Sequence, residues 1–129
     1  MIVMEDVIST EWQLLYANNP KIQYFGVISS GEVVWQTNNW NLVKDVDQII
    51  TALRVLDSEI SIDKVRYTRI QSRSDYFLGI SEKSHEHVII CRVDDKSWVI
   101  ARSSSDSVPE LARIDVARTA IKLIGVLSK

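Results

Sequence analysis

The sequence is poor in the residues that mark several large classes of protein. Its one cysteine, Cys91, excludes an internal disulfide, and the apolar neighbours of this residue predict a buried strand. With four glycines and two prolines there is no glycine-rich phosphate loop and no flexible linker, so residues 1–129 are expected to form a single domain. No apolar run is long enough for a membrane span, and the N-terminus lacks the basic start of a signal peptide. We therefore expect a soluble protein of the reducing cytoplasm.

The chain also lacks an excess of charge of either sign. The chain has 15 Lys and Arg against 17 Asp and Glu, which leaves a formal net charge of -2. Such a balance argues against affinity based on neutralising phosphates, so nucleic acid is not expected as a partner. What is present is apolar material: 46% of the residues are hydrophobic, enough for a core in a chain of this length without disulfides or metals.

The stretch from Tyr24 to Trp40 predicts a β-hairpin around which the rest of the chain is arranged. Its first half is apolar on both faces, it reverses at Ser30-Gly31, and it returns through Val34 and Trp35. Gly31 can adopt the positive φ of a tight turn. A strand that is apolar on both faces must be covered on both sides, so we expect helices above and below this sheet.

Helical spacing of apolar residues predicts three helices. The first covers residues 4–18, and the second covers residues 42–60 with Asn41 as its N-cap. The third begins with a capping box at Ser107-Val108-Pro109-Glu110 and runs to the end of the chain. The predicted buried stripes of the second and third helices consist of these residues: Leu42, Val46, Ile49, Ile50, Leu53, Leu56 and Ile60, and then Leu111, Ile114, Ala117, Ile121 and Ile124.

Four further β-like runs lie between the second and third helices, at residues 65–71, 76–81, 87–93 and 97–103. Their short connections predict antiparallel neighbours that extend the hairpin as a meander. The predicted fold is therefore α+β, an antiparallel six-stranded sheet with the N- and C-terminal helices on one face and the middle helix on the other.

This order of elements, and the central stretch above all, resembles the profilin family. The residues that carry the resemblance are Trp12 and Tyr16 on the first helix, Val34-Trp35-Gln36-Thr37 on the second strand, and Trp40. The long middle helix departs from the eukaryotic pattern, so the resemblance is to a divergent, archaeal-type member. It implies a monomeric cytoplasmic protein that binds an actin monomer, or an actin homologue, and regulates filament assembly without a cofactor.

The resemblance also implies two binding surfaces. The later strands and the start of the last helix would contact actin through seven charged residues: Arg69, Arg73, Arg92, Lys96, Arg102, Glu110 and Arg113. The aromatic residues Trp12, Tyr16 and Trp35 would bind proline-rich peptides, because flat rings stack on a polyproline helix. The last helix adds no aromatic residue to this groove, so the alternative is that Trp12 and Trp35 are core residues.

Two other interpretations remain open. The long middle helix also fits the roadblock family, whose members are homodimeric scaffolds or regulators of small GTPases, although that family normally has five strands. A small-ligand sensor on a related sheet would be supported by a deep apolar cavity between sheet and helix. A tight homodimer would favour the roadblock interpretation, and a monomer would favour profilin.

Catalytic chemistry finds little support in the sequence. His85-Glu86-His87 could place two histidines on one side of an extended segment, but zinc needs three or four ligands, so we prefer a solvated loop that enters a strand. The serines at 103–105 have no glycine elbow to mark a nucleophile. We expect no enzyme activity, no metal and no cofactor.

Overall fold

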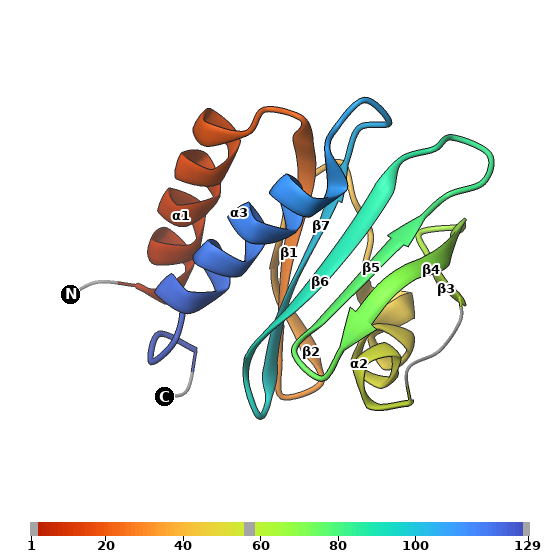
Figure 1. Cartoon of the computed structure of the whole chain (residues 1–129). Coiled ribbons are helices and arrows are strands. Elements are labelled where there is room, and N and C mark those ends of the chain that lie inside the picture. Colours follow the sequence, from red (N-terminus) through yellow and green to blue (C-terminus); the bar gives the residue numbers. More distant parts are fainter. Residues whose placement is uncertain (1–2, 56–58, 128–129) are drawn as a thin grey trace.

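A seven-stranded antiparallel sheet organises the described part of the chain, with the strand order β2-β1-β7-β6-β5-β4-β3 (Figure 1). The structure is a computed structural model that describes residues 3–55 and 59–127, with the backbone alone for residues 52–55. The elements are α1 (Met4–Asn18), β1 (Ile22–Ser29), β2 (Glu32–Gln36), η1 (Val43–Asp45), α2 (Val46–Val55), β3 (Glu59–Ile62), β4 (Val65–Arg73), β5 (Tyr76–Ile80), β6 (His87–Asp94), β7 (Ser97–Ser103) and α3 (Pro109–Lys122).

Helices cover the two faces of this sheet as the sequence predicted. Both terminal helices, α1 and α3, lie on one face, and α2 lies on the other (Figure 1). Residues that follow one another along a strand enter different cores: Leu78 and Ile89 face α1 and α3, whereas Phe77 and Ile90 face α2. This alternation explains why the central strands read as continuous apolar runs, since each must fill two cores.

The predicted hairpin is confirmed as β1 and β2. Ser30 and Gly31 form its turn with φ values of 53° and 81°, the positive values that a two-residue turn matched to the twist of the strands requires. Val27 pairs with Trp35, which places the indole in the second strand on the face of the terminal helices. Trp35 is half-buried there, as the arrangement predicted from the sequence requires.

The prediction of six strands and a middle helix over residues 42–60 was wrong. The helical part is shorter, formed by η1 and α2, and Glu59–Ile62 is a strand that pairs with β4. Ile60 and Ile62 are buried while Glu59 and Ser61 alternate with them, which is the period of a strand. Asp63 and Lys64 turn the chain with φ values of 48° and 69°, without the glycine that usually signals such a turn.

The predicted stripe of the middle helix is buried where the structure describes it. Leu42, Val46 and Ile49 are at most 8% exposed and pack against the α2 face of the sheet. Leu53 and Leu56, predicted on the same stripe, lie outside the described side chains. The register of this helix on the sheet is therefore the one that its apolar spacing predicts.

The predicted buried face of α3 was wrong. The residues that face the sheet are Ala112, Val116, Thr119, Ala120 and Leu123, all at most 5% exposed. Most of the predicted stripe points outward instead, with Leu111, Ile114, Ile121 and Ile124 between 40% and 64% exposed, while Ala117 packs against the core. Both sets have helical spacing, so periodicity cannot choose between them. Smaller side chains allow the helix to lie close on β6 and β7, and this packing decides the orientation.

The predicted capping box of α3 is also absent. The helix has Val108 as its N-cap, with no side-chain hydrogen bond at this cap, and Pro109 begins the first turn as expected. The hydroxyl of Ser107 is buried and lies 2.8 Å from the Ser103 hydroxyl and 3.3 Å from Nδ1 of His87. Ser107 therefore anchors the start of α3 to the sheet rather than capping its free N-H groups.

Candidate functional site

One face of the sheet is covered only in part. α1 lies on β1 and β2 and α3 lies on β6 and β7, so the strands at the β3 edge extend beyond the helices (Figure 1). Arg73, on β4, pairs with Tyr76 on β5, and Tyr76 belongs to the core on the side of α1 and α3. Directly opposite residues of antiparallel strands share a face, so Arg73 projects from the open part of this face.

The start of α3 completes this surface. The guanidinium of Arg113 lies 4.5 Å from the ring centroid of Tyr76, a cation–π distance. Its Nε is 3.6 Å from a carboxylate oxygen of Glu110, one turn earlier. The exposed side chain of Ile114 follows on the outer side of the same helix. We refer to Arg73, Glu110, Arg113 and Ile114 as the α3-side surface.

The other predicted actin-contact residues of the strands lie on the opposite face. Arg92 pairs with Trp98 and Arg102 pairs with Val88, and both partners belong to the core against α2. Arg69 pairs with Gly79, on the same side as these. The seven residues predicted from the sequence therefore do not form one surface, and three of them, Arg73, Glu110 and Arg113, are brought together.

A bulge in β4 separates two arginines that a regular strand would place together. Arg69 and Arg73 are four residues apart, so simple alternation puts them on one face. The pairing with β5 shifts between Arg69 and Gln71, which leaves Ile70 as the extra residue and reverses the alternation beyond it. As a result Arg73 joins the α3-side surface and Arg69 does not.

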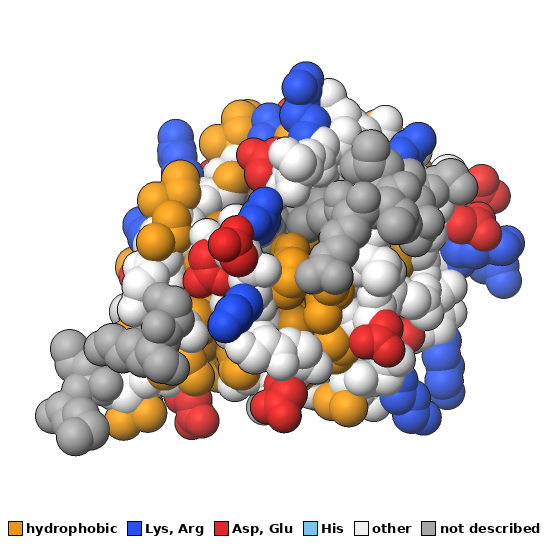
Figure 2. Space-filling view, turned by 90° about the horizontal axis from the view of Figure 1, so that it is seen from below, with side chains coloured by type: hydrophobic (Ala, Val, Ile, Leu, Met, Phe, Trp, Pro, Cys, Tyr) orange, Lys and Arg blue, Asp and Glu red, His pale blue; other side chains and the backbone are white. Residues whose placement is uncertain are grey.

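Lys96 occupies the turn between β6 and β7, next to Arg92 and away from the α3-side surface. Its backbone N-H donates to a carboxylate oxygen of Asp94 over 2.9 Å, and Asp95 in the same turn pairs with Arg92. Figure 2, seen from the end of the molecule that carries this turn, shows acidic and basic side chains interspersed with hydrophobic ones. This end of the molecule therefore has no patch of uniform charge in the view of Figure 2 that could attract a partner of opposite charge.

The predicted aromatic residues form a row that runs from α1 into the hairpin. Ring centroids are 5.6 Å apart for Tyr16 and Trp12, 5.6 Å for Trp12 and Phe25, and 6.1 Å for Phe25 and Trp35. Trp12 and Trp35 are half-buried against the core, whereas Tyr16 is 47% exposed. A shallow depression beside α1 is lined by Trp12, Gln13, Tyr16, Gln23, Tyr24 and Asn39.

The histidine segment is a loop that enters a strand, as preferred from the sequence, but its two rings differ. His85 is exposed with a φ of 61°, so the segment is not extended there. His87 is 5% exposed, and burial lowers its pKa below the ordinary value of 6.5. Within residues 3–55 and 59–127 no group of three or more His, Cys, Asp or Glu side chains is placed to hold a metal ion.

The layered arrangement of these elements is the profilin fold. LokiProfilin1, whose structure was solved in complex with rabbit actin, matches with a TM-score of 0.87 at 21% identity, covering 97% of this chain and 99% of that one. Acanthamoeba castellanii profilin IB matches with a TM-score of 0.74 at 13% identity, covering 88% and 93%. At these identities the likeness concerns the fold.

Sequence comparison adds a relative. The chain matches no protein-family profile. It is 29% identical over 124 residues to Thor profilin from Thorarchaeota archaeon (strain AB_25), covering 94% of this chain and 97% of the relative. The chain is therefore similar to archaeal profilins in sequence and has the profilin fold, as the resemblance predicted. Among the described residues no helix is long and apolar enough to cross a membrane.

Proposed function

We propose that the protein binds monomeric actin, or an archaeal actin homologue, and so controls the supply of subunits to filaments. The observation that carries this proposal is the fold shared over nearly the whole chain with LokiProfilin1 from its complex with rabbit actin. LokiProfilin2, also solved with rabbit actin, matches with a TM-score of 0.82 at 23% identity. The action is stoichiometric, needs neither catalysis nor a cofactor, and takes place in the cytoplasm.

The α3-side surface is the part of the molecule best suited to this contact. Ile114 is 40% exposed although nothing in the fold requires an apolar side chain there. Exposed apolar residues beside arginines are the usual composition of the centre of a protein interface. Arg73 and Arg113 can form paired hydrogen bonds with partner carboxylates, and their stems add apolar contact. One monomer of actin occupied in this way would keep its other end free to add to a filament.

Polymerisation in the presence of equimolar protein tests this function. Fluorescently labelled rabbit actin and the cognate actin should both polymerise more slowly, because part of the monomer pool is bound. No effect on either actin at stoichiometric protein would reject the proposal. The variant Arg73→Glu should weaken the effect, since it reverses the charge of one of the two arginines of the α3-side surface.

A matched control comes from the opposite face. Lys44, in η1, is exposed on the side of α2, so Lys44→Glu makes the same change of charge away from the α3-side surface. The Lys44→Glu variant should slow polymerisation to the same extent as the unaltered protein. Equal loss of activity in both variants would show that net charge, and not this surface, governs the effect.

Proline-rich peptides are a second candidate partner, favoured by the exposed ring of Tyr16 next to Trp12 in the depression beside α1. Two neighbouring rings can stack on successive turns of a polyproline helix. The α3 helix supplies no residue to this depression, so binding would involve α1 and the hairpin alone. Titration with a decaproline peptide, followed by tryptophan fluorescence, should give a saturating change that Tyr16→Ala weakens and Leu14→Ala, another exposed α1 position, does not.

The roadblock interpretation makes a different prediction for the assembly state. It requires a tight homodimer, whereas the proposed function requires a monomer that is free to bind actin. Sedimentation equilibrium at micromolar concentration distinguishes these. A stable dimer would support the scaffold alternative.

A further inference from the structure

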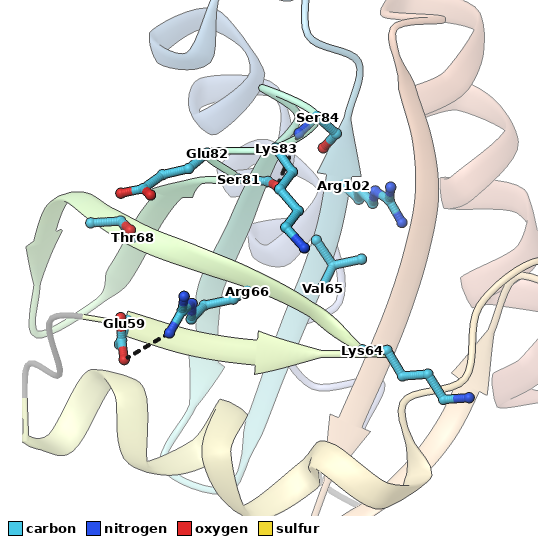
Figure 3. Close-up of a pocket in the computed structure, with 10 residues that line it drawn as sticks. All are labelled: Glu59, Lys64, Val65, Arg66, Thr68, Ser81, Glu82, Lys83, Ser84 and Arg102. Atoms are coloured by element: carbon cyan, nitrogen blue, oxygen red, sulfur yellow. Dashed lines mark hydrogen bonds and ion pairs between the residues drawn. The ribbon is translucent and has the colours of Figure 1, made fainter.

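A polar cavity lies at one end of the sheet, between the start of β4 and the loop that joins β5 to β6 (Figure 3). It encloses about 370 Å³, which is within the range of pockets that hold small ligands or single side chains. It lies apart from the residues of the α3-side surface. The lining consists of Glu59, Lys64, Val65, Arg66, Thr68, Ser81, Glu82, Lys83, Ser84 and Arg102.

Basic groups dominate this lining. Lys64 and Lys83 are exposed, and neither forms an ion pair within residues 3–55 and 59–127. Arg66 lies 3.9 Å from Glu59, but both side chains are more than half exposed, so this pair holds its charges weakly. In Figure 3 the side chain of Lys83 reaches from the loop toward Val65 at the start of β4. The cavity therefore offers cationic groups that are not used inside the protein.

Arg102 forms the buried part of the wall. Its side chain is 14% exposed and is held in place by an ion pair with Glu86. Its guanidinium lies 4.6 Å from the ring centroid of Tyr24, and its buried Nε has no hydrogen-bond partner among the described residues. Burial by itself would lower the pKa of Arg102, but the hydrogen bond to Glu86 and nearby tyrosines raise it above the ordinary value, so the guanidinium stays charged.

The loop above the cavity is fixed by its own hydrogen bonds. The backbone N-H of Ser81 donates to the carbonyl of Glu86, and that of His85 donates to the carbonyl of Ser81. The hydroxyl oxygens of Ser81 and Ser84 accept backbone N-H groups over 3.3 Å, which leaves the hydroxyl hydrogens free to donate. The hydroxyl oxygens of Ser81 and Ser84 are thus held in position before any ligand arrives.

Two carboxylates restrict which anion fits. Glu59 and Glu82 line the same cavity as the basic groups. They would repel a doubly charged phosphate at close range, whereas a single carboxylate leaves the balance of charge favourable. The same two carboxylates can accept backbone N-H groups of a bound polypeptide. Because Lys64, Arg66 and Lys83 are exposed, the cavity opens directly to solvent and admits a side chain carried by another chain.

We propose that this cavity binds a glutamate or aspartate side chain of an acidic polypeptide segment. The carboxylate lies against Arg102 and Lys83, with Ser84 as a hydroxyl donor, and the flanking backbone meets Glu59 and Glu82 at the rim. This site is separate from the proposed actin contact and does not depend on it. It gives the protein a second point of attachment for an acidic partner.

The test is a titration of the ¹⁵N-labelled protein with a capped hexapeptide of alternating Glu and Gly, followed by amide chemical shifts. Saturating shifts are expected at Val65, Thr68 and Ser84, and the matched Gln-Gly peptide should give none. Lys83→Gln should weaken binding about threefold, the scale of one exposed charge pair. Lys44→Gln removes an exposed lysine outside the cavity and should change nothing.

Competing ions identify the source of the carboxylate. Free glutamate should bind more weakly than the peptide, because it lacks the flanking backbone. Equal binding of the Gln-Gly peptide, tighter binding of inorganic phosphate than of the acidic peptide, or unchanged affinity in Lys83→Gln would each overturn the proposal. Since the readout is peptide binding to the protein alone, failure here is distinct from failure to affect actin.

Discussion

The two helical layers of the molecule use their large aliphatic residues in opposite ways. On the α2 side, Leu42, Val46 and Ile49 are buried against the sheet, so hydrophobic spacing and packing agree. On the other side, α3 packs through Ala112, Val116 and Ala120 and leaves its larger residues in solvent. The apolar stripe of α2 is explained by folding alone. That of α3 is not, which is why we assign it to a partner.

The largest expected effect is a difference in stability between a variant in α2 and a variant in α3. Ile49→Ala removes a side chain that is 0% exposed and should lower the free energy of unfolding by about 2–5 kcal/mol. Ile121→Ala, at a position that is 64% exposed, should change it by less than about 0.5 kcal/mol. Urea unfolding followed by circular dichroism measures both. Similar losses in the two variants would contradict the orientation of α3.

A pair of neighbours on α3 tests the same orientation within one helix. Ala112 is fully buried, so Ala112→Leu should overpack the contact with the sheet and cost about 1–3 kcal/mol. Leu111→Ala, one residue earlier and exposed, should cost less than about 0.5 kcal/mol. Thermal unfolding gives the comparison. The reverse order of stabilities would mean that the helix presents its other face to the sheet.

A smaller effect is expected on binding, without a change in stability. Ile114→Asp places a charge in the exposed stripe of α3 and should weaken actin binding about tenfold, or about 1.4 kcal/mol, if this residue lies within the interface. Its unfolding curve should match that of the unaltered protein. Val43→Asp, at a 65% exposed position beside α2, is the control and should bind normally. Loss of binding in the control alone would move the contact to the α2 side.

The last effect concerns pH and should appear in the α3 layer. Buried His87 has a lowered pKa, so below its ordinary value of 6.5 the unfolded chain binds a proton that the native state does not. The free energy of unfolding should then fall by up to about 1.4 kcal/mol per pH unit until native His87 is protonated too, and this contribution is fully restored above pH 6.5.

Urea unfolding between pH 7.5 and 5 measures this slope. His87→Gln should remove most of it, and His85→Gln, at an exposed position, should leave it unchanged. Amide exchange at acid pH should rise first near Ser107 at the start of α3, because Ser107 contacts the His87 ring. An unchanged slope in His87→Gln would assign the titration to another group.

Much of this fold could be predicted from the sequence, because its signals were local. The first helix has the predicted bounds, residues 4–18, because the spacing of its apolar residues decides them. The hairpin turns at Gly31 as predicted, because turn chemistry decides its position. β3 was missed because Ile60 fits the helical period as well as the strand period. The turn after β3, at Asp63-Lys64, also carries no glycine to mark it.

The surfaces could be predicted less well, because they depend on packing and register. Two stripes of α3 share a helical period, and only contact with β6 and β7 selects the one with smaller residues. The bulge at Ile70 reverses the faces of Arg69 and Arg73, and no residue type announces it in the sequence. The cavity beside Lys83 was not foreseen either, since it joins residues 59–68, 81–84 and 102.

The bulge in β4 also affects how the molecule behaves when crowded. Among the described residues β3 covers β4 only as far as Thr68, so the rest of this long strand has no described strand beside it on that side and could template the growth of fibrils. The irregular backbone at Ile70, together with the arginines at 69 and 73, makes that edge a poor template. A protein that must stay dispersed at high concentration would gain colloidal stability from this single extra residue.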